Sequence, residues 1–283
     1  MPLKKIFKKI SVIPKLIKNE GLDAFYWRIL KNLGIKLNYY SPIQKRKYLL
    51  QNKIIEITNS KVIDGNYKSL YLNCNNDRSS HDFSSKLLGC YEEEVQNKLI
   101  ELAKKYKLKN IVNFGSAEGF HILGLLKNNF FENGFIFETN KKLISSFEDN
   151  KKKNNINNDV KIFNQYAKLE TLEEYINEED LKKTLFLVDI EGSEYEMFKN
   201  QNINKFKNSI FIIEDHPFYK KKDENLEFYN LIEKKFKVSY VFSSNRDPFK
   251  FKELNDFNDD DKWLLMSECR PKSMRWIVLE PLD

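Results

Sequence analysis

Short, continuous apolar runs alternate along the chain with longer segments in which apolar residues recur at helical spacing. The runs at 111–114, 134–138, 160–167, 184–188 and 209–213 have the length and continuity of strands. Strands that read as continuous apolar runs are typical of parallel sheets, which helices cover on both faces. The alternation predicts an α/β fold with a doubly wound, mostly parallel sheet.

Two late runs, 237–243 and 274–279, complete the predicted sheet. No helical crossover pattern lies between them, so we expect an antiparallel pair at one edge of the sheet. Residues 1–53 read as a basic helical arm that contains aromatic residues, and residues 54–283 read as the α/β domain. At the start of this domain, 54–72 has a strand-like pattern with a turn signal inside it.

A glycine turn follows the run at 111–114, in the sequence Asn113-Phe114-Gly115-Ser116-Ala117-Glu118-Gly119, and a helix-like stretch follows the turn. Strand, glycine turn and helix are typical of a nucleotide-binding α/β unit, because glycine lets the backbone turn tightly and approach a ligand closely. Glu138 ends the next strand, nineteen positions after Gly119. An acid about 20 residues after the turn is placed where it can bind ribose hydroxyl groups. Without a ligand, the glycines serve the turn alone and Glu138 is a solvated charge.

Carboxylates also follow the run at 184–188, where Asp189, Glu191 and Glu194 surround a second glycine turn. Open α/β sheets bind their ligands at the carboxyl ends of the strands, which makes this cluster a candidate site. Glu194 has a second explanation, because acids are favoured in the first turn of a helix. His216 lies at the end of the next strand, and its titration near neutral pH makes it a candidate general base.

The composition narrows the class of protein without deciding it. The chain has 283 residues and a formal net charge of +7, and it shows no pattern typical of nucleic-acid-binding domains. Its three cysteines have no C-x-x-C spacing, so neither a disulfide framework nor a zinc site is indicated. No apolar run is long enough to span a bilayer. We therefore expect a cytoplasmic protein that binds no nucleic acid.

The N-terminal residues 3–17 form a basic segment in which apolar residues recur at helical spacing up to Pro14. Such a segment can lie on an anionic membrane surface, which would place the protein peripherally at the inner membrane. It can equally form an arm that packs on its own domain and leaves its lysines in solvent. The sequence leaves both interpretations open, and it does not indicate the oligomeric state.

Three motifs give the chain a resemblance to class I S-adenosylmethionine-dependent methyltransferases of the FkbM type. That family typically shows Asp-x-Gly-Ala-Asn-x-Gly, then Phe-Glu-Pro, then Asp-(Ile/Val)-Glu-Gly-x-Glu. Here the motifs stand as Asn113–Gly119, Phe137-Glu138-Thr139 and Asp189-Ile190-Glu191-Gly192-Ser193-Glu194. Asn113 replaces the usual Asp, and Ala117-Glu118 replaces Asn followed by an aliphatic residue. The resemblance covers roughly residues 88 to 280 and implies a seven-stranded sheet that ends in a hairpin.

The resemblance also implies roles for individual residues. The backbone of the glycine turn would receive the methionine part of S-adenosylmethionine, and Glu138 would bind its ribose. Gln165 or Tyr166 would lie near the adenine, and Asp189 would line the face toward the methyl acceptor together with Glu191. The expected cofactor-binding residues are Asn113, Gly115, Ser116, Ala117, Gly119, Glu138, Gln165, Tyr166 and Asp189.

Methyl transfer from a sulfonium is an in-line displacement, so the enzyme mainly positions the acceptor and removes its proton. We expect His216 to be the base, oriented by Asp189 or Asp215, and no metal. The alternative is a metal bound by Asp189, Glu191, Asp215 and His216. The long segment before the last strand is of a kind that often forms a substrate wall. With Glu191, it supplies the expected substrate residues Arg246, Glu268 and Arg270.

The sequence thus predicts an S-adenosylmethionine-dependent methyltransferase that O-methylates a sugar, a glycan precursor or another small molecule. The sugar acceptor follows from the resemblance alone. One alternative is a nicotinamide-dependent oxidoreductase, which would be expected to have Gly at position 117 and gives the acids at 189–194 no role. Another is a non-catalytic protein that binds membrane surfaces on a degenerate methyltransferase fold. Asn113, Ala117 and the basic N-terminal segment would suit that protein.

Overall fold

A computed structural model gives the three-dimensional structure of the chain. It describes residues 41–73, 82–200, 203–219, 222–270, 272 and 274–282, together with scattered positions between 14 and 33. The chain divides into two compact units, Met1–Asn52 and Lys53–Asp283. Apart from Pro14 and Ile17, the predicted basic segment lies outside the described residues, so its membrane contact stays a prediction. None of the described helices is long and apolar enough to cross a membrane.

The second unit is built on a seven-stranded sheet with the strand order β3-β2-β1-β4-β5-β7-β6. The first five strands pair in parallel, and β7 is antiparallel to both of its neighbours, β5 and β6. The predicted mostly parallel sheet with an antiparallel hairpin at its edge is therefore confirmed. The strands are β1 (Asn110–Phe114), β2 (Asn133–Phe137), β3 (Val160–Phe163), β4 (Thr184–Val188), β5 (Ile210–Asp215), β6 (Phe236–Phe242) and β7 (Arg275–Pro281).

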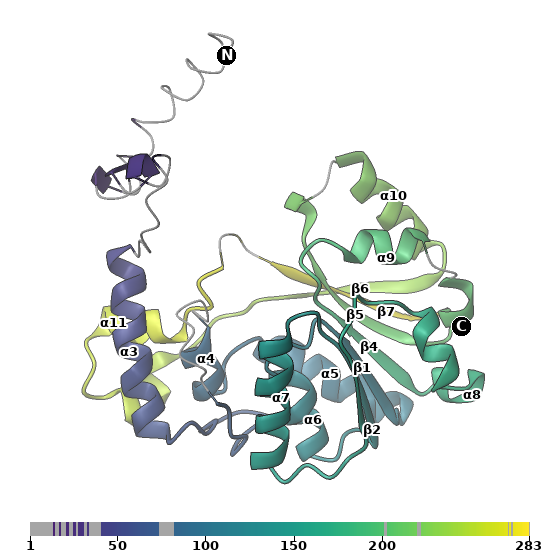
Figure 1. The fold of residues 1–283 in the computed structure, drawn as a ribbon, viewed down its shortest axis with the longest axis horizontal. Coiled ribbons are helices and arrows are strands. Elements are labelled where there is room, and N and C mark those ends of the chain that lie inside the picture. Colours follow the sequence, from purple (N-terminus) through teal and green to yellow (C-terminus); the bar gives the residue numbers. More distant parts are fainter. Residues whose placement is uncertain are drawn as a thin grey trace. The chain divides into compact units, whose positions relative to one another are not determined.

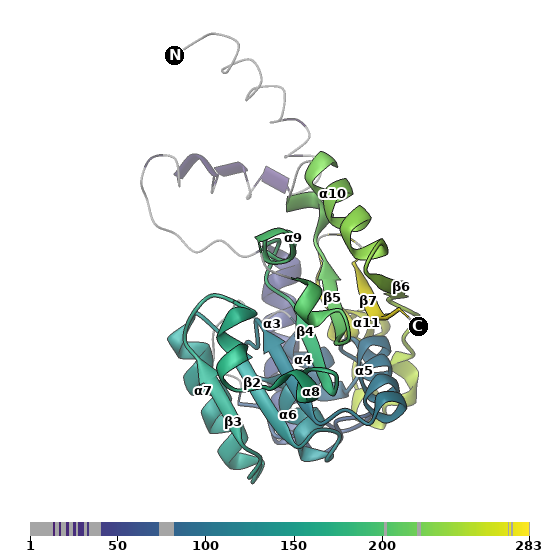
Figure 2. The ribbon, with the colours of Figure 1, turned by 90° about the vertical axis from the view of Figure 1, so that its right-hand side faces the viewer.

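Helices cover both faces of the sheet (Figures 1 and 2). The helices α9 and α10 pack on one face, and α5 and α6 lie on the other. The described α-helices are α3 (Pro42–Thr58), α4 (Phe83–Leu88), α5 (Glu93–Tyr106), α6 (Phe120–Lys127), α7 (Lys141–Lys153), α8 (Glu178–Leu181), α9 (Glu194–Asn200), α10 (Lys222–Glu233) and α11 (Asp259–Met266). Short 3-10 turns lie at Glu170–Glu174, Ile203–Phe206, Pro217–Tyr219, Pro248–Lys250 and Lys252–Leu254.

In strand β5, successive side chains lie on opposite faces of the sheet. All of its residues are buried, as expected for a central strand covered on both sides. Phe211 and Ile213 join the apolar core beneath α9 and α10, and the Phe211 ring packs against Phe198 of α9. Successive side chains point to opposite faces, so Asp215 lies on this face and Glu214 on the other. Because of this alternation, Glu214 and Asp215 have different neighbours at the end of the strand.

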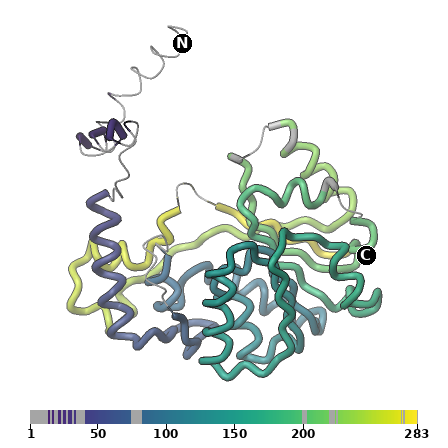
Figure 3. The backbone as a smooth tube through the Cα atoms, in the orientation of Figure 1, coloured from purple at the N-terminus to yellow at the C-terminus, as the bar shows by residue number. Residues whose placement is uncertain are grey.

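One segment differs from its predicted structure. The strand-like pattern over 54–72 is not a strand: α3 continues to Thr58, and the rest contributes an isolated antiparallel bridge between Lys61 and Tyr71. The segment between β6 and β7 leaves the sheet and returns to it (Figure 3). It contains α11, which packs against α4 and does not form a crossover between parallel strands.

Candidate functional site

A cavity of about 650 Å³ opens at the carboxyl ends of β1, β2 and β4, and we call it the main cavity. The strand order reverses between β1 and β4, and open α/β sheets bind their ligands at such a switch point. Ligand sites typically have volumes of roughly 300–1,000 Å³, so the main cavity is large enough for a small organic molecule. Position and size together mark it as the candidate binding site.

The main cavity brings together residues that the sequence places far apart. Six predicted site residues line it: Gly115, Glu138, Gln165, Tyr166, Asp189 and Glu191. A second cavity, of about 50 Å³, shares Gly115 and Asp189 with the main cavity. It is lined by three further predicted residues, Asn113, Ser116 and Ala117. Gly119 is not among the described lining residues of either cavity.

The glycine turn has a structural reason for its two glycines. Gly115 and Gly119 both have left-handed backbones, with φ of 78° and 91°. A Cβ on Gly115 would lie 1.8 Å from the carbonyl oxygen of Asp189, and a Cβ on Gly119 would lie 2.4 Å from the Phe147 ring. The turn therefore packs against the end of β4 and against α7 too closely for any side chain. Ala117 is also left-handed, with φ of 47°, although it carries a Cβ.

Glu138 joins the end of β2 to the glycine turn. One carboxylate oxygen accepts a hydrogen bond from the backbone N–H of Ala117 at 3.2 Å, and the other accepts one from the N–H of Asn140 at 2.8 Å. The side chain is half-buried and lines the main cavity. These bonds hold an ionisable acceptor at the cavity wall, in the place where the sequence predicts ribose binding.

The rest of the cavity wall is mixed in character. Phe137, Ile190 and Met197 supply apolar surface beyond the carboxylates. Gln165 donates a side-chain hydrogen bond to Thr171 at 3.0 Å, which leaves its carbonyl oxygen without a bond in the described structure. The neighbouring Tyr166 is 79% exposed. An apolar wall with a few polar groups is typical of small-molecule binding sites.

Lys86 explains one departure from the motif of the glycine turn. Its buried ammonium pairs with Glu118 at 2.5 Å and with Asp82 at 2.7 Å, and it lines the second cavity. Burial alone would lower the pKa of Lys86, but the two carboxylates outweigh it and raise the pKa above its ordinary value. Glu118 thus stands where the motif has an aliphatic residue because it neutralises a buried cation. Asn113, the other departure, donates its amide to the carbonyl oxygen of Leu187 at 3.4 Å.

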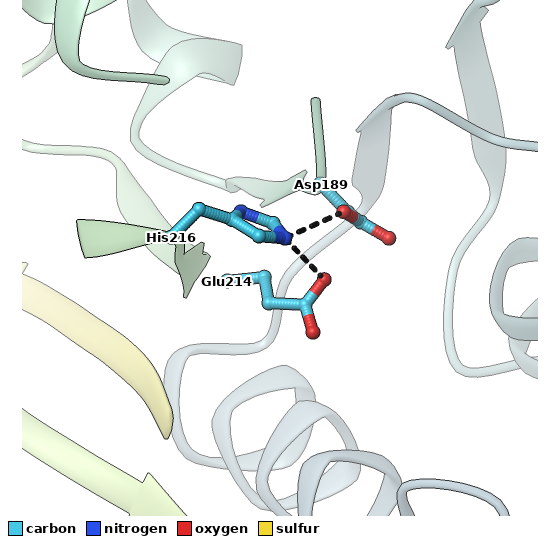
Figure 4. A group of neighbouring side chains, drawn as sticks. All are labelled: Asp189, Glu214 and His216. Atoms are coloured by element: carbon cyan, nitrogen blue, oxygen red, sulfur yellow. Dashed lines mark ion pairs between the residues drawn. The ribbon is translucent and has the colours of Figure 1, made fainter. Parts of the chain in front are cut away.

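Four carboxylates converge on the ring of His216, and we call these five residues the His216 cluster. Nδ1 lies 2.9 Å from Glu194. Nε2 lies 3.3 Å from Glu214, 3.7 Å from Glu191 and 4.0 Å from Asp189. In Figure 4, one edge of the imidazole faces Glu214 and Asp189. Asp189 follows β4, and Glu214 and His216 lie at the end of the adjacent parallel strand β5. Both His216 and Glu214 are buried.

The carboxylates around His216 determine its protonation state near neutral pH. Burial would lower the pKa of His216, but hydrogen bonds with Glu194 and Glu214 raise it to about 10. Burial and the adjacent Glu214 raise the pKa of Asp189 well above its ordinary value. Near neutral pH, His216 is then an imidazolium with both nitrogens donating, and in that state it cannot be the predicted base.

Asp215 does not orient His216, contrary to the prediction. It lies on the opposite face of the sheet, where its carboxylate accepts hydrogen bonds from Tyr195 at 2.5 Å, Tyr229 at 2.9 Å and Arg275 at 2.6 Å. Adjacent strand residues alternate between faces, so Glu214 points toward the cluster and Asp215 points away from it. The orienting carboxylate is Glu194, which binds Nδ1.

The predicted substrate residues Arg246, Glu268 and Arg270 form ion pairs within the protein. Arg270 pairs with Glu92, Glu214 and, at 2.6 Å, with Glu268. Arg246 pairs with the other oxygen of Glu268. None of the three is among the described lining residues of the two cavities. In this state their charges stabilise the polar network and do not face the main cavity.

The residues of the site that were not predicted include Lys86, Glu92 and Glu214. Glu214 had a usable signal, because it lies two positions before His216 and period-two alternation puts both on one side. No local sequence pattern indicates the contacts of Glu92 and Lys86. Glu92 binds Arg270, 178 positions away, and Lys86 binds Glu118, 32 positions away.

The strand order and the site define the class of the protein. It is a Rossmann-like α/β domain with the seven-stranded sheet and final hairpin that the methyltransferase resemblance implied. Its main cavity lies where such domains bind their ligands.

Comparison with known proteins gives distant structural similarities. No protein-family model and no curated protein matches the sequence. The chain is similar to the structure of an rRNA methylase from Streptococcus thermophilus, at 12% identity over 67% of this chain and 96% of the other, with a TM-score of 0.41. It is similar to precorrin-6y C5,15-methyltransferase from Geobacter metallireducens (12% identity, 67% and 89% covered, TM-score 0.42) and to the METTL16 methyltransferase domain (14%, 67% and 67%, 0.46). At these values no substrate or site residue carries over to this chain.

Proposed function

We propose that this chain is an S-adenosylmethionine-dependent methyltransferase that binds the cofactor in the main cavity. One observation carries the proposal: Glu138 presents its carboxylate to a cavity of about 650 Å³ at the switch point of the sheet, beside the glycine turn. A carboxylate in this place accepts hydrogen bonds from the two hydroxyl groups of a ribose.

The residues of the main cavity fit the parts of this cofactor. Glu138 would hold the ribose, and the apolar side chains of Ile190 and Met197 would contact the adenine. The exposed Tyr166 lies at the same wall and could stack on the base. Gly115 would bring the backbone close to the methionine part of the cofactor.

The acceptor would reach the cofactor beside Asp189, which lines both cavities. When bound, S-adenosylmethionine supplies an electrophilic methyl group on a sulfonium. Asp189 lines the main cavity, and its second carboxylate oxygen points away from His216 (Figure 4), so that oxygen can accept the hydroxyl proton of a substrate. We infer that Asp189 takes the role of base that the sequence assigned to His216. O-methylation of a sugar, and membership of the FkbM type, rest on the resemblance of the three motifs alone.

A nicotinamide-dependent oxidoreductase has less support. The dinucleotide fingerprint Gly-x-Gly-x-x-Gly would need glycines at positions 117 and 120 after Gly115. These positions hold Ala117 and Phe120. Phe120 is buried at the start of α6, where the third glycine of that fingerprint would allow helix and strand to pack closely.

Calorimetric titration of the full chain with S-adenosylmethionine, and separately with NAD, tests the proposal. We expect S-adenosylmethionine to bind and NAD not to bind. Glu138→Gln should weaken the binding about 10- to 100-fold, because hydrogen bonds to a charged group contribute about 1.5–3 kcal/mol. Glu132→Gln is the matched control. Glu132 is exposed at the other end of β2, away from the cavity, so its substitution should leave the affinity unchanged.

The outcomes separate the candidate functions. Equal weakening by both substitutions would show a charge effect without a ribose contact. Binding of NAD alone would replace the methyltransferase with the oxidoreductase. If neither cofactor binds to a folded protein, the non-catalytic interpretation stands, and flotation with anionic liposomes, with and without residues 1–20, becomes the next measurement.

A further inference from the structure

We propose that Asp189, Glu214 and His216 bind one divalent transition-metal ion. One oxygen or nitrogen atom from each of these residues lies within 4.8 Å of the other two. Nε2 of His216 lies 3.3 Å from Glu214 and 4.0 Å from Asp189. Metal–ligand bonds of about 2.0–2.2 Å place neighbouring ligand atoms roughly 3.0–3.6 Å apart, so small side-chain movements would complete the coordination.

Two further contacts aim the ligand atoms at a common point. Glu194 accepts a hydrogen bond from Nδ1 of His216 at 2.9 Å, which leaves Nε2 as the atom that faces Glu214 and Asp189. A carboxylate on the second nitrogen is the usual way to orient a metal-binding histidine. Arg270 binds Oε1 of Glu214, and Oε2 is therefore the oxygen that faces His216.

Asp189 supplies an independent sign that a ligand belongs here. Its Oδ1, the oxygen nearest to His216, is buried and has no hydrogen-bond partner among the described residues. Buried carboxylate oxygens without a donor are rare, because their loss of hydration is not compensated. The cluster also holds four carboxylates against one guanidinium, that of Arg270. A cation between the three ligand atoms would satisfy Oδ1 and offset this charge.

The donor set points to the kind of metal. One imidazole nitrogen and two carboxylate oxygens suit Mn²⁺, Fe²⁺, Co²⁺ or Zn²⁺ better than Mg²⁺ or Ca²⁺, which prefer oxygen donors alone. Three protein ligands leave coordination positions open, as in catalytic metal sites. The second oxygen of Asp189 points away from His216 and Glu214 (Figure 4), and Asp189 lines the main cavity. The open positions can therefore be reached by a small molecule or by Glu191.

The alternative occupant of this point is a proton. If Nε2 of His216 carries a hydrogen that it donates to Glu214, and Asp189 and Glu214 share a second proton, the three side chains need no metal. Metal and proton compete for the same nitrogen, so a direct binding measurement distinguishes them. The proposal does not depend on methyl transfer, because its test measures metal binding and not turnover.

The experiment uses the full chain without a histidine tag, after treatment with a chelator. Titration with Mn²⁺, followed by the electron paramagnetic resonance of the free ion, and calorimetry with Zn²⁺ should each give one equivalent per chain. Asp189→Asn should weaken the binding at least about 100-fold, and Glu194→Gln about 10- to 100-fold, because even outer-shell partners of metal ligands have effects of that size. Glu233→Gln is the matched control: Glu233 is exposed at the end of α10 and is not among the described lining residues of either cavity, so this substitution should leave the affinity unchanged.

Asp189→Asn decides the test if other variants fold poorly, because asparagine keeps the size and shape of the aspartate side chain. Circular dichroism checks that this variant is folded, and the added metal should raise the melting temperature of the wild type but not that of the variant. Absence of binding by the folded wild type, or equal affinity in Asp189→Asn, would overturn the proposal in favour of the proton. Titration of the same samples with S-adenosylmethionine keeps the two proposals separate, since either ligand can bind without the other.

Discussion

The backbone of Ala117 offers a prediction with an unusual sign: replacing this alanine by asparagine or glycine should stabilise the protein. Ala117 lies in the glycine turn with φ of 47°, in the left-handed region. A Cβ in this region crowds the following carbonyl oxygen and costs roughly 1–2 kcal/mol. Asparagine tolerates this conformation better than alanine does, and glycine has no Cβ to crowd.

The magnitude follows from two opposing contributions. Ala117→Gly removes the strain of about 1–2 kcal/mol but gives the unfolded chain more freedom, which costs about 0.4–1 kcal/mol. The net gain is roughly 0.5–1 kcal/mol, and Ala117→Asn should gain a similar amount without the entropy cost. For a domain of this size, 1 kcal/mol raises the melting temperature by about 2–4 °C. Glu138 binds the backbone N–H of residue 117, so both variants keep that hydrogen bond.

Urea unfolding and thermal melting of both variants measure the effect. Ala103→Gly is the matched control, because Ala103 lies inside α5, where glycine costs about 1 kcal/mol relative to alanine. The same substitution should therefore stabilise the protein at position 117 and destabilise it at position 103. If Ala117→Gly lowers the free energy of unfolding as Ala103→Gly does, the left-handed turn is absent in solution and the reasoning fails.

Two further predictions concern stability. Gly115→Ala should lower the free energy of unfolding by roughly 3 kcal/mol. The new Cβ would strain the left-handed backbone and lie 1.8 Å from the carbonyl oxygen of Asp189. An unchanged melting temperature would contradict the close packing of turn and strand. Burial would raise the pKa of Glu280, but hydrogen bonds from Lys105 and Tyr106 outweigh it and lower the pKa below 4.5. Its contribution to stability is therefore complete above about pH 4.5 and disappears as the pH falls through the lowered pKa. Glu280→Gln should lose stability at pH 7 and show a shallower acid dependence in urea titrations between pH 3 and 7, whereas a parallel shift at every pH would refute the assignment.

The sheet and the main cavity could be predicted because both follow from local patterns. A central parallel strand such as β4 is buried on both faces, so it must read as a continuous apolar run. Polar residues directly after such runs come together at one edge, because the strands are parallel and in register. Glu138, Gln165 and Asp189 meet at the main cavity for this reason, although 51 positions separate the first from the last (138 to 189).

Local sequence patterns do not determine the structure where they are ambiguous. The sequence Ile54-Ile55-Glu56-Ile57-Thr58 is rich in β-branched residues and resembles a strand, but it forms the last turns of α3. Tertiary context overrides such weak propensities. Of the two predicted partners of His216, Asp189 and Asp215, the second is its neighbour in sequence but not in space. In a strand, the residue two positions away shares the face, and Glu214 is that residue.

Arg270 shows the limit of what any local pattern can give. It joins Glu92, before α5, to Glu214, at the end of β5, and these partners lie 178 and 56 positions away in the sequence. Nothing near Arg270 in the chain indicates either contact, and a charged residue in a long segment suggests a substrate wall equally well. The contact with Glu214 matters for the proposed metal site, because Arg270 binds Oε1 of Glu214 and leaves Oε2 to face His216. The arrangement of the ligand atoms at the end of β5 therefore depends on a side chain that only the folded structure brings there.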